Sequence, residues 1–416
     1  MSSSSQSQNL DVTLSLSLPP RNEGLNPQER GIKLIQLLLS CANHASSGNL
    51  HHADTCLHHI SELASVTGDS MQRLAARFAA ALAARLLKRW PGLYKALNNG
   101  GLVGFDVDRA RSIFARAFPC LGFAYAVINR TLIQALLGER EVHVIDLGCG
   151  DPKLWVPFVR AMADGPNGPP RLKITSVGIN KEAQERLEGR ILKEGQSLKM
   201  EIVLNHVDAK LRDLSLDMLE VKPGEALALT SILSLHVLLA EDDGVDARFG
   251  LRSKNNQVSE CKRMVEFLEM VRSVGPKVVL LVEQESNHNS SRLVDRFVEG
   301  LHFYSALFDL IDATFGALSC SNRATLEEMF GREIENIVAG EGLEREERHE
   351  RYAKWGIRFT TSGFRPIHLW YDSMEEARKV VEAYGPRGFS IISERGSLMI
   401  CWHDRPIYAV SAWSLF

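Results

Sequence analysis

From residue 141 onward, short apolar segments alternate with segments of helical periodicity, and this alternation sets the fold class. Strands are predicted at residues 141–148, 172–179, 201–204, 226–231 and 277–283, and helices at 181–194, 235–239 and 258–274. Strands that are apolar along their whole length are typical of a parallel sheet covered by helices on both faces. The pattern therefore predicts an α/β fold with a doubly wound, mostly parallel sheet.

The segments on either side of this alternation have different patterns. Apolar residues at helical spacing in residues 32–137 predict about four to six helices, and residues 290–355 return to helix. Strands predicted at 367–371, 389–393, 397–402 and 406–412, with a helix at 374–384, end the chain in antiparallel hairpins. We divide the chain into a disordered tail (1–28), a helical cap (29–137), a Rossmann-like core (138–289), a helical insertion (290–355) and C-terminal strands (356–416).

Composition excludes several classes of protein. The 416 residues carry 48 Lys and Arg against 51 Asp and Glu, so DNA binding would need a local basic patch. The seven cysteines form no C-x-x-C pair, which favours reduced and packed thiols. No apolar run reaches the roughly 20 residues that a membrane span needs, so we expect no membrane contact.

A glycine turn follows the first predicted strand. Asp146, Gly148 and Gly150 form a D-x-G-x-G pattern that resembles the first motif of S-adenosylmethionine methyltransferases. Glycines at such a turn let the backbone approach a nucleotide, and the next helix offers free N–H groups. If this chain binds that cofactor, Asp146, Gly148, Gly150 and Asp208 are the residues that hold it.

Two departures favour a purely structural role for the turn. Pro152 occupies the place of the third glycine, where it adds bulk and donates no hydrogen bond. The second strand ends in Asn180 and Lys181 instead of the acidic residue that holds ribose hydroxyls. We therefore expect no cofactor and no catalytic residue, and keep a methyltransferase as the alternative.

Two other polar features are interpreted as solvated surface. The pairs His51–His52 and His58–His59 lie near Cys56, but histidines on an exposed helix face explain this spacing better than a zinc site. The mixed-charge residues 341–351 are predicted to form a solvated helix face. Neither feature is expected to bind a metal.

Motifs along the chain resemble those of the GRAS family of plant proteins. The resemblance runs from Gly31 to the C-terminus. Residues 35–42 and 69–75 resemble its first leucine-rich region, 142–146 its VHIID motif, 198–239 its second leucine-rich region, 282–309, 331–337 and 347–350 its PFYRE region, and 409–413 its SAW motif.

The resemblance implies a nuclear, non-enzymatic regulator of transcription in plant growth and development, in gibberellin signalling and root development. It implies partners among DELLA proteins and zinc-finger transcription factors, homo- or heterodimers formed through the leucine-rich regions, and mainly indirect contact with DNA. The stripe at residues 35–39 is first of all expected to be core, with surplus apolar surface free for an interface. A dimer that binds specific DNA sequences directly is a further alternative.

The N-terminal tail carries a short motif of its own. Leu14, Leu16 and Leu18 alternate with serines and precede Pro19 and Pro20, so an extended peptide presents all three leucines on one side. The pattern resembles the L-x-L-x-L repression motif that binds TOPLESS-type corepressors. Chance occurrence in a tail rich in Ser and Leu explains the same pattern equally well.

Overall fold

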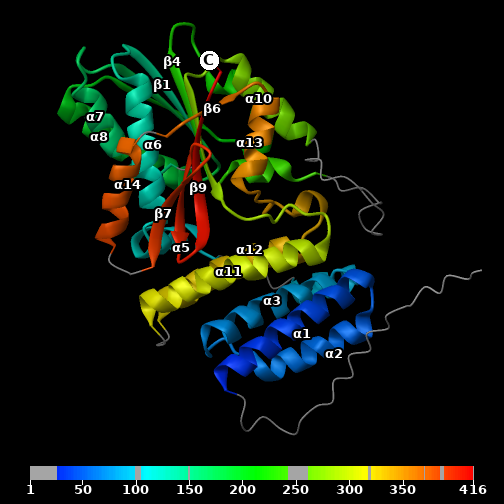
Figure 1. The fold of residues 1–416 in the computed structure, drawn as a ribbon. Helices are drawn as coiled ribbons and strands as arrows, with labels where there is room; N and C mark the ends of the chain where they lie inside the picture. Colours follow the sequence, from blue (N-terminus) through cyan, green and yellow to red (C-terminus); the bar gives the residue numbers. More distant parts are fainter. Residues whose placement is uncertain are drawn as a thin grey trace, which may run out of the picture.

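The computed structural model describes residues 26–98, 105–148, 150–241, 261–316, 320–369, 371–384 and 388–415, and Figure 1 shows their arrangement. Leu14, Leu16 and Leu18, together with Cys149 inside the glycine turn, lie outside the described residues. Among the described helices none is by itself long and apolar enough to cross a membrane.

A nine-stranded sheet forms the centre of the fold. Its parallel part has the order β3-β2-β1-β4-β5, which is the doubly wound arrangement, and antiparallel strands continue it as β9-β8-β7 with β6 also paired to β9. The predicted α/β fold is confirmed. The strands are β1 (Glu141–Leu147), β2 (Arg171–Val177), β3 (Ile202–Val207), β4 (Ala226–Ile232), β5 (Val278–Gln284), β6 (Arg365–Ile367), β7 (Phe389–Glu394), β8 (Ser397–Trp402) and β9 (Arg405–Ser414).

Successive side chains along the strands point to opposite faces of the sheet and belong to two separate hydrophobic cores. Val142 and Val144 of β1 enter one core, whereas Ile145 and Leu147 enter the other. Helices cover both faces (Figure 1). The first face carries α6 (Cys120–Leu136), α7 (Pro152–Ala163), α8 (Lys181–Leu198) and α14 (Tyr371–Ala383), and the second carries α10 (Lys262–Ser273) and α13 (Tyr352–Thr361).

A helical layer lies to one side of the sheet. It consists of α1 (Pro27–Ser47), α2 (Leu50–Leu63) and α3 (Ser70–Leu87), with α2 packed on α1 and α3. Helices α1 and α3 pack on the long helices α11 (Leu293–Phe315) and α12 (Ser321–Ala339), which lie between this layer and the sheet (Figure 1). The remaining helices of the N-terminal third are α4 (Pro91–Asn98) and α5 (Val107–Ala117). The helices of residues 29–137 thus do not form one layer, because α6 packs against the sheet and α14.

One local prediction was wrong, and one predicted helix is of the 3-10 type. Residues 367–371 are not a strand, since β6 ends at Ile367 and α14 begins at Tyr371. The periodicity of a short apolar run cannot distinguish a strand from the start of a helix. The predicted helix at 235–239 is the 3-10 helix η3 (Leu235–Leu239), which follows β4 directly.

Candidate functional site

The glycine turn lies where the strand order reverses, between the carboxyl ends of β1 and β4. Gly148 has a φ of 100° and Gly150 a φ of 54°, both in the left-handed region that favours glycine. A Cβ on Gly148 would lie 2.9 Å from Oγ of Ser234, which follows β4. Backbone conformation and close packing therefore account for Gly148 without any ligand.

The carboxylate of Asp146 is bonded inside the protein. Its Oδ2 accepts hydrogen bonds from Nε1 of Trp155 at 2.8 Å and from the backbone N–H of Gly150 at 2.9 Å. Asp146 and Trp155 are both fully buried. Pro152 begins α7, and its N-cap Asp151 accepts from the N–H of Lys153 at 2.9 Å.

The residues at the ends of the next strands face other partners. Asn180 caps α8 by accepting from the N–H of Ala183 at 3.0 Å and donates to Asp108 on α5 at 2.5 Å. Asp208, directly after β3, is exposed and pairs with Lys181 at 3.3 Å. Asp146 and Asp208 therefore each have a different partner within the protein. The residues predicted to hold S-adenosylmethionine thus fit this cofactor poorly.

A second candidate site lies in the segment predicted to be a solvated helix face, and that prediction was wrong. Only the 3-10 turn η4 (Gly342–Glu344) is helical, and residues 345–351 have no regular secondary structure. Arg345, Arg348, His349 and Glu350 are all buried. A charged run can be buried when every charge finds a partner, as Glu350 does with Arg358 at 2.7 Å.

Neighbouring elements hold this segment in place. Oδ1 of Asn336 on α12 accepts from the backbone N–H groups of Glu346 and Glu347, both at 2.9 Å. The N–H of His288, in the loop after β5, donates to the carbonyl of His349 at 2.9 Å. Arg345 donates back to the carbonyl of His288 at 3.0 Å. The segment is thus fixed between α12 and the carboxyl end of β5.

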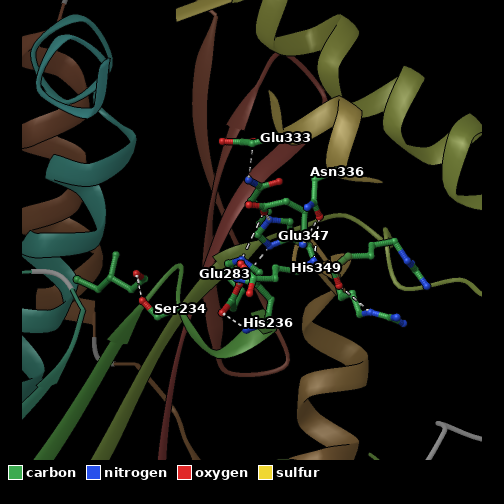
Figure 2. A network of polar contacts seen from close by, with 12 residues as sticks. Ser234, His236, Glu283, Glu333, Asn336, Glu347 and His349 are labelled. Carbon is green, nitrogen blue, oxygen red and sulfur yellow. Dashed lines mark hydrogen bonds and ion pairs between the residues drawn. The ribbon is translucent and has the colours of Figure 1, made fainter. Parts of the chain in front are cut away.

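Four side chains form a closed ring at this place, which we call the His–Glu ring: His236 from η3, Glu283 from β5, and Glu347 and His349 from the segment (Figure 2). Oε2 of Glu283 lies 3.0 Å from Nδ1 of His236 and 3.3 Å from Nδ1 of His349. Oε2 of Glu347 lies 3.4 Å from Nε2 of His236 and 2.9 Å from Nε2 of His349. The centroids of the two imidazoles are 3.8 Å apart.

The ring strongly perturbs the acidity of its members. Burial alone would lower the pKa of His236, but the charges and hydrogen bonds of Glu283 and Glu347 outweigh it and raise the pKa to about 10. Burial would likewise raise the pKa of Glu283, yet His236 and His349 hold it at about 2. Next to the ring, burial and the charge of Glu347 raise the pKa of Glu333 to about 7.

The ring has donor atoms of the kind that bind a metal ion. Donor atoms of His236, Glu283 and His349 all lie within 4.8 Å of one another, the one such group found in the described part of the chain. The histidine pairs considered from the sequence lie instead on α2, where His51, His52 and His58 are exposed. Sequence spacing missed the ring because its members come from three distant segments.

Comparison with known proteins agrees with this architecture. A crystal structure titled SCL7 in Oryza sativa superposes with a TM-score of 0.76 at 26% identity, covering 91% of this chain and 99% of that one. Scarecrow-like protein 3 of Arabidopsis thaliana is 39% identical over 435 residues, covering 94% of this chain and 90% of that protein.

More distant relatives cover most of the chain as well. DELLA protein RGL1 of Arabidopsis thaliana is 31% identical over 394 residues, covering 94% of this chain and 71% of the relative. The sequence pattern of the GRAS domain family matches residues 34–414, from the first turns of α1 to the end of β9. The chain therefore belongs to the GRAS domain family.

Proposed function

We propose that this protein is a non-enzymatic regulator of transcription in plant growth and development, acting in gibberellin signalling and root development by binding other proteins in the nucleus. Family membership and similarity to DELLA proteins support the regulatory role. The observation that supports the non-enzymatic part is the glycine turn, in which Trp155 and Gly150 both donate hydrogen bonds to the carboxylate of Asp146.

The first leucine-rich region offers a surface for partners. Leu34, Leu37 and Leu38 of α1 are buried in the core, whereas Ile32 and Ile35 are 52% and 37% exposed. Residues three apart on a helix lie on the same face, so the two isoleucines form one apolar patch on α1. Exposed apolar surface of this kind is typical of protein interfaces. We assign this face to DELLA proteins, zinc-finger transcription factors or a second GRAS chain, with DNA contacted mainly through such partners.

The tail supplies a second contact in this proposal. Leu14, Leu16 and Leu18 bind a TOPLESS-type corepressor as an extended peptide, with the three leucines entering one groove. The tail and the α1 face would then recruit different proteins, so that one chain connects a corepressor to a DNA-bound factor.

Proximity labelling in plant cell nuclei tests the proposal. The full chain should label transcription factors and other GRAS proteins, and the double variant Ile32→Glu/Ile35→Glu should lose a large part of that set without a change in melting temperature. Ile179→Glu is the matched control, because Ile179 is 61% exposed but lies after β2. Labelling that contains no transcriptional proteins, or that the α1 variant leaves unchanged, contradicts the proposed interface.

A further inference from the structure

We propose that the His–Glu ring is a binding site for one transition-metal dication of the Zn²⁺ class. The ligands are Nδ1 of His236, Nδ1 of His349 and a carboxylate oxygen of Glu283. Glu347 does not bind the ion in this assignment but orients the two imidazoles. The site goes beyond the regulatory function, because it concerns what holds three distant segments together.

The distances from Glu283 to the two imidazoles suit such an ion. Zn²⁺ bonds to His nitrogen and carboxylate oxygen are about 2.0–2.2 Å long, so neighbouring ligand atoms of a tetrahedral site lie roughly 3.3 Å apart. Oε2 of Glu283 lies 3.0 Å from Nδ1 of His236 and 3.3 Å from Nδ1 of His349. One carboxylate oxygen thus meets two imidazole nitrogens at the ligand-to-ligand distance of a zinc site.

The opposite sides of the rings supply an independent argument. Nε2 of His236 and Nε2 of His349 both face Oε2 of Glu347, at 3.4 Å and 2.9 Å. Histidines that bind a metal usually donate their other N–H to a carboxylate or carbonyl, which fixes the tautomer and turns the free nitrogen toward the ion. Glu347 occupies this place for both histidines at once.

Charge also favours a single dication. Glu283 is buried and Glu347 is partly buried, so positive charge close to both carboxylates stabilises them. One dication beside Oε2 of Glu283 and the two Nδ1 atoms would supply this charge where the donor atoms meet.

The donor set and its surroundings define which ion fits. Two imidazole nitrogens and one carboxylate favour Zn²⁺ and related ions over Ca²⁺ and Mg²⁺, which prefer oxygen ligands. His236, Glu283 and His349 are almost completely buried, while the side chain of Glu347 is 27% exposed and gives the ring a contact with solvent. A bound ion would link η3, the end of β5 and residues 345–350, so we assign it a structural role.

Metal titration of the full chain, first stripped with a chelator, tests the site. We expect one equivalent of Zn²⁺ per chain in competition with a chromophoric chelator, a rise in melting temperature, and Co²⁺ absorption bands of a tetrahedral site with nitrogen and oxygen ligands. His349→Gln should weaken binding by at least about 100-fold, and Glu347→Gln by about 10- to 100-fold.

Two controls separate this site from other histidines. His143→Gln removes a buried histidine of β1, and His52→Gln/His59→Gln removes two histidines of α2; both variants should keep stoichiometric binding. The Co²⁺ spectrum of the unmodified chain decides the matter if His349→Gln does not fold. Absence of a stoichiometric equivalent, equal binding by folded His349→Gln, or loss of binding in the α2 variant would overturn the proposal.

Discussion

The indole Nε1 of Trp155 donates to Oδ2 of Asp146 over 2.8 Å, and both side chains are fully buried beside the glycine turn. Trp155→Phe removes this donor while keeping an aromatic ring. We expect the free energy of unfolding to fall by about 1–3 kcal/mol, because a buried carboxylate loses a hydrogen bond. Urea unfolding measures the loss of stability. Trp90→Phe is the control, because Trp90 is half exposed. Equal stability of the two variants would show that the contact matters little.

The buried guanidinium of Arg73 joins α3 to the long helices. Its Nε donates to Glu327 on α12 at 2.7 Å, and Arg73 also pairs with Asp312 on α11. Removing one partner of a buried pair leaves the other charge poorly compensated, so Arg73→Ala should cost about 3–5 kcal/mol of unfolding free energy.

A neighbouring pair provides the control for that variant. Arg77 contacts Glu328 at 2.6 Å, but its side chain is 27% exposed. Arg77→Ala should cost less than about 1 kcal/mol, because solvent screens the pair. If thermal or urea unfolding shows equal losses for Arg73→Ala and Arg77→Ala, burial does not determine the strength of these contacts.

Acid should weaken the fold partly through His143. Its Nδ1 lies 2.8 Å from Glu225 and its Nε2 2.8 Å from the hydroxyl of Thr175. Burial lowers the pKa of His143 below the ordinary 6.5, although Glu225 opposes the shift. The unfolded chain therefore takes up this proton at higher pH than the folded chain does. The contribution of His143 is fully present above about pH 6.5 and is lost as the pH falls.

A variant series isolates that contribution. Stability measured by urea unfolding between about pH 7.5 and 5.5 should fall less steeply for His143→Gln than for the unmodified chain. His51→Gln, on an exposed part of α2, should keep the original slope. A slope that His143→Gln leaves unchanged would assign the acid sensitivity to other groups.

The tail motif predicts a loss of binding without a loss of stability. Replacing Leu14, Leu16 and Leu18 with Ala should end pull-down of a TOPLESS-type corepressor, because the apolar side chains that fill its groove are gone. The melting temperature should not change, since the tail is expected to bury nothing. Changing Ser15 and Ser17 to Ala is the matched control. Corepressor capture by the triple-leucine variant would exclude the motif.

The sequence predicted the sheet well because its local signals agree with one another. In β1, four of the six residues from Val142 to Leu147 are apolar, and Asp151 with Pro152 marks the start of α7 independently of tertiary contacts. The same local consistency holds in the C-terminal hairpins, where Gly396 lies at the turn between β7 and β8 and has a φ of 89°.

The His–Glu ring could not be predicted from the sequence in the same way. His236 and His349 are far apart in the chain, and only the packing of η3 and residues 345–350 against β5 brings them together. The charged run at 341–351 has the composition of a solvated helix, and nothing local shows that Asn336 and Glu283 provide partners for it inside the fold. Burial of charge depends on tertiary partners, which a composition argument does not contain.

Titration calorimetry of the full chain with S-adenosylmethionine tests most directly whether this protein works through its surfaces instead of through chemistry at the glycine turn. Because Trp155 and Gly150 already occupy the carboxylate of Asp146, we predict no saturable heat of binding. Saturable binding at micromolar ligand that Gly148→Arg abolishes, accompanied by methyl transfer, would contradict the account.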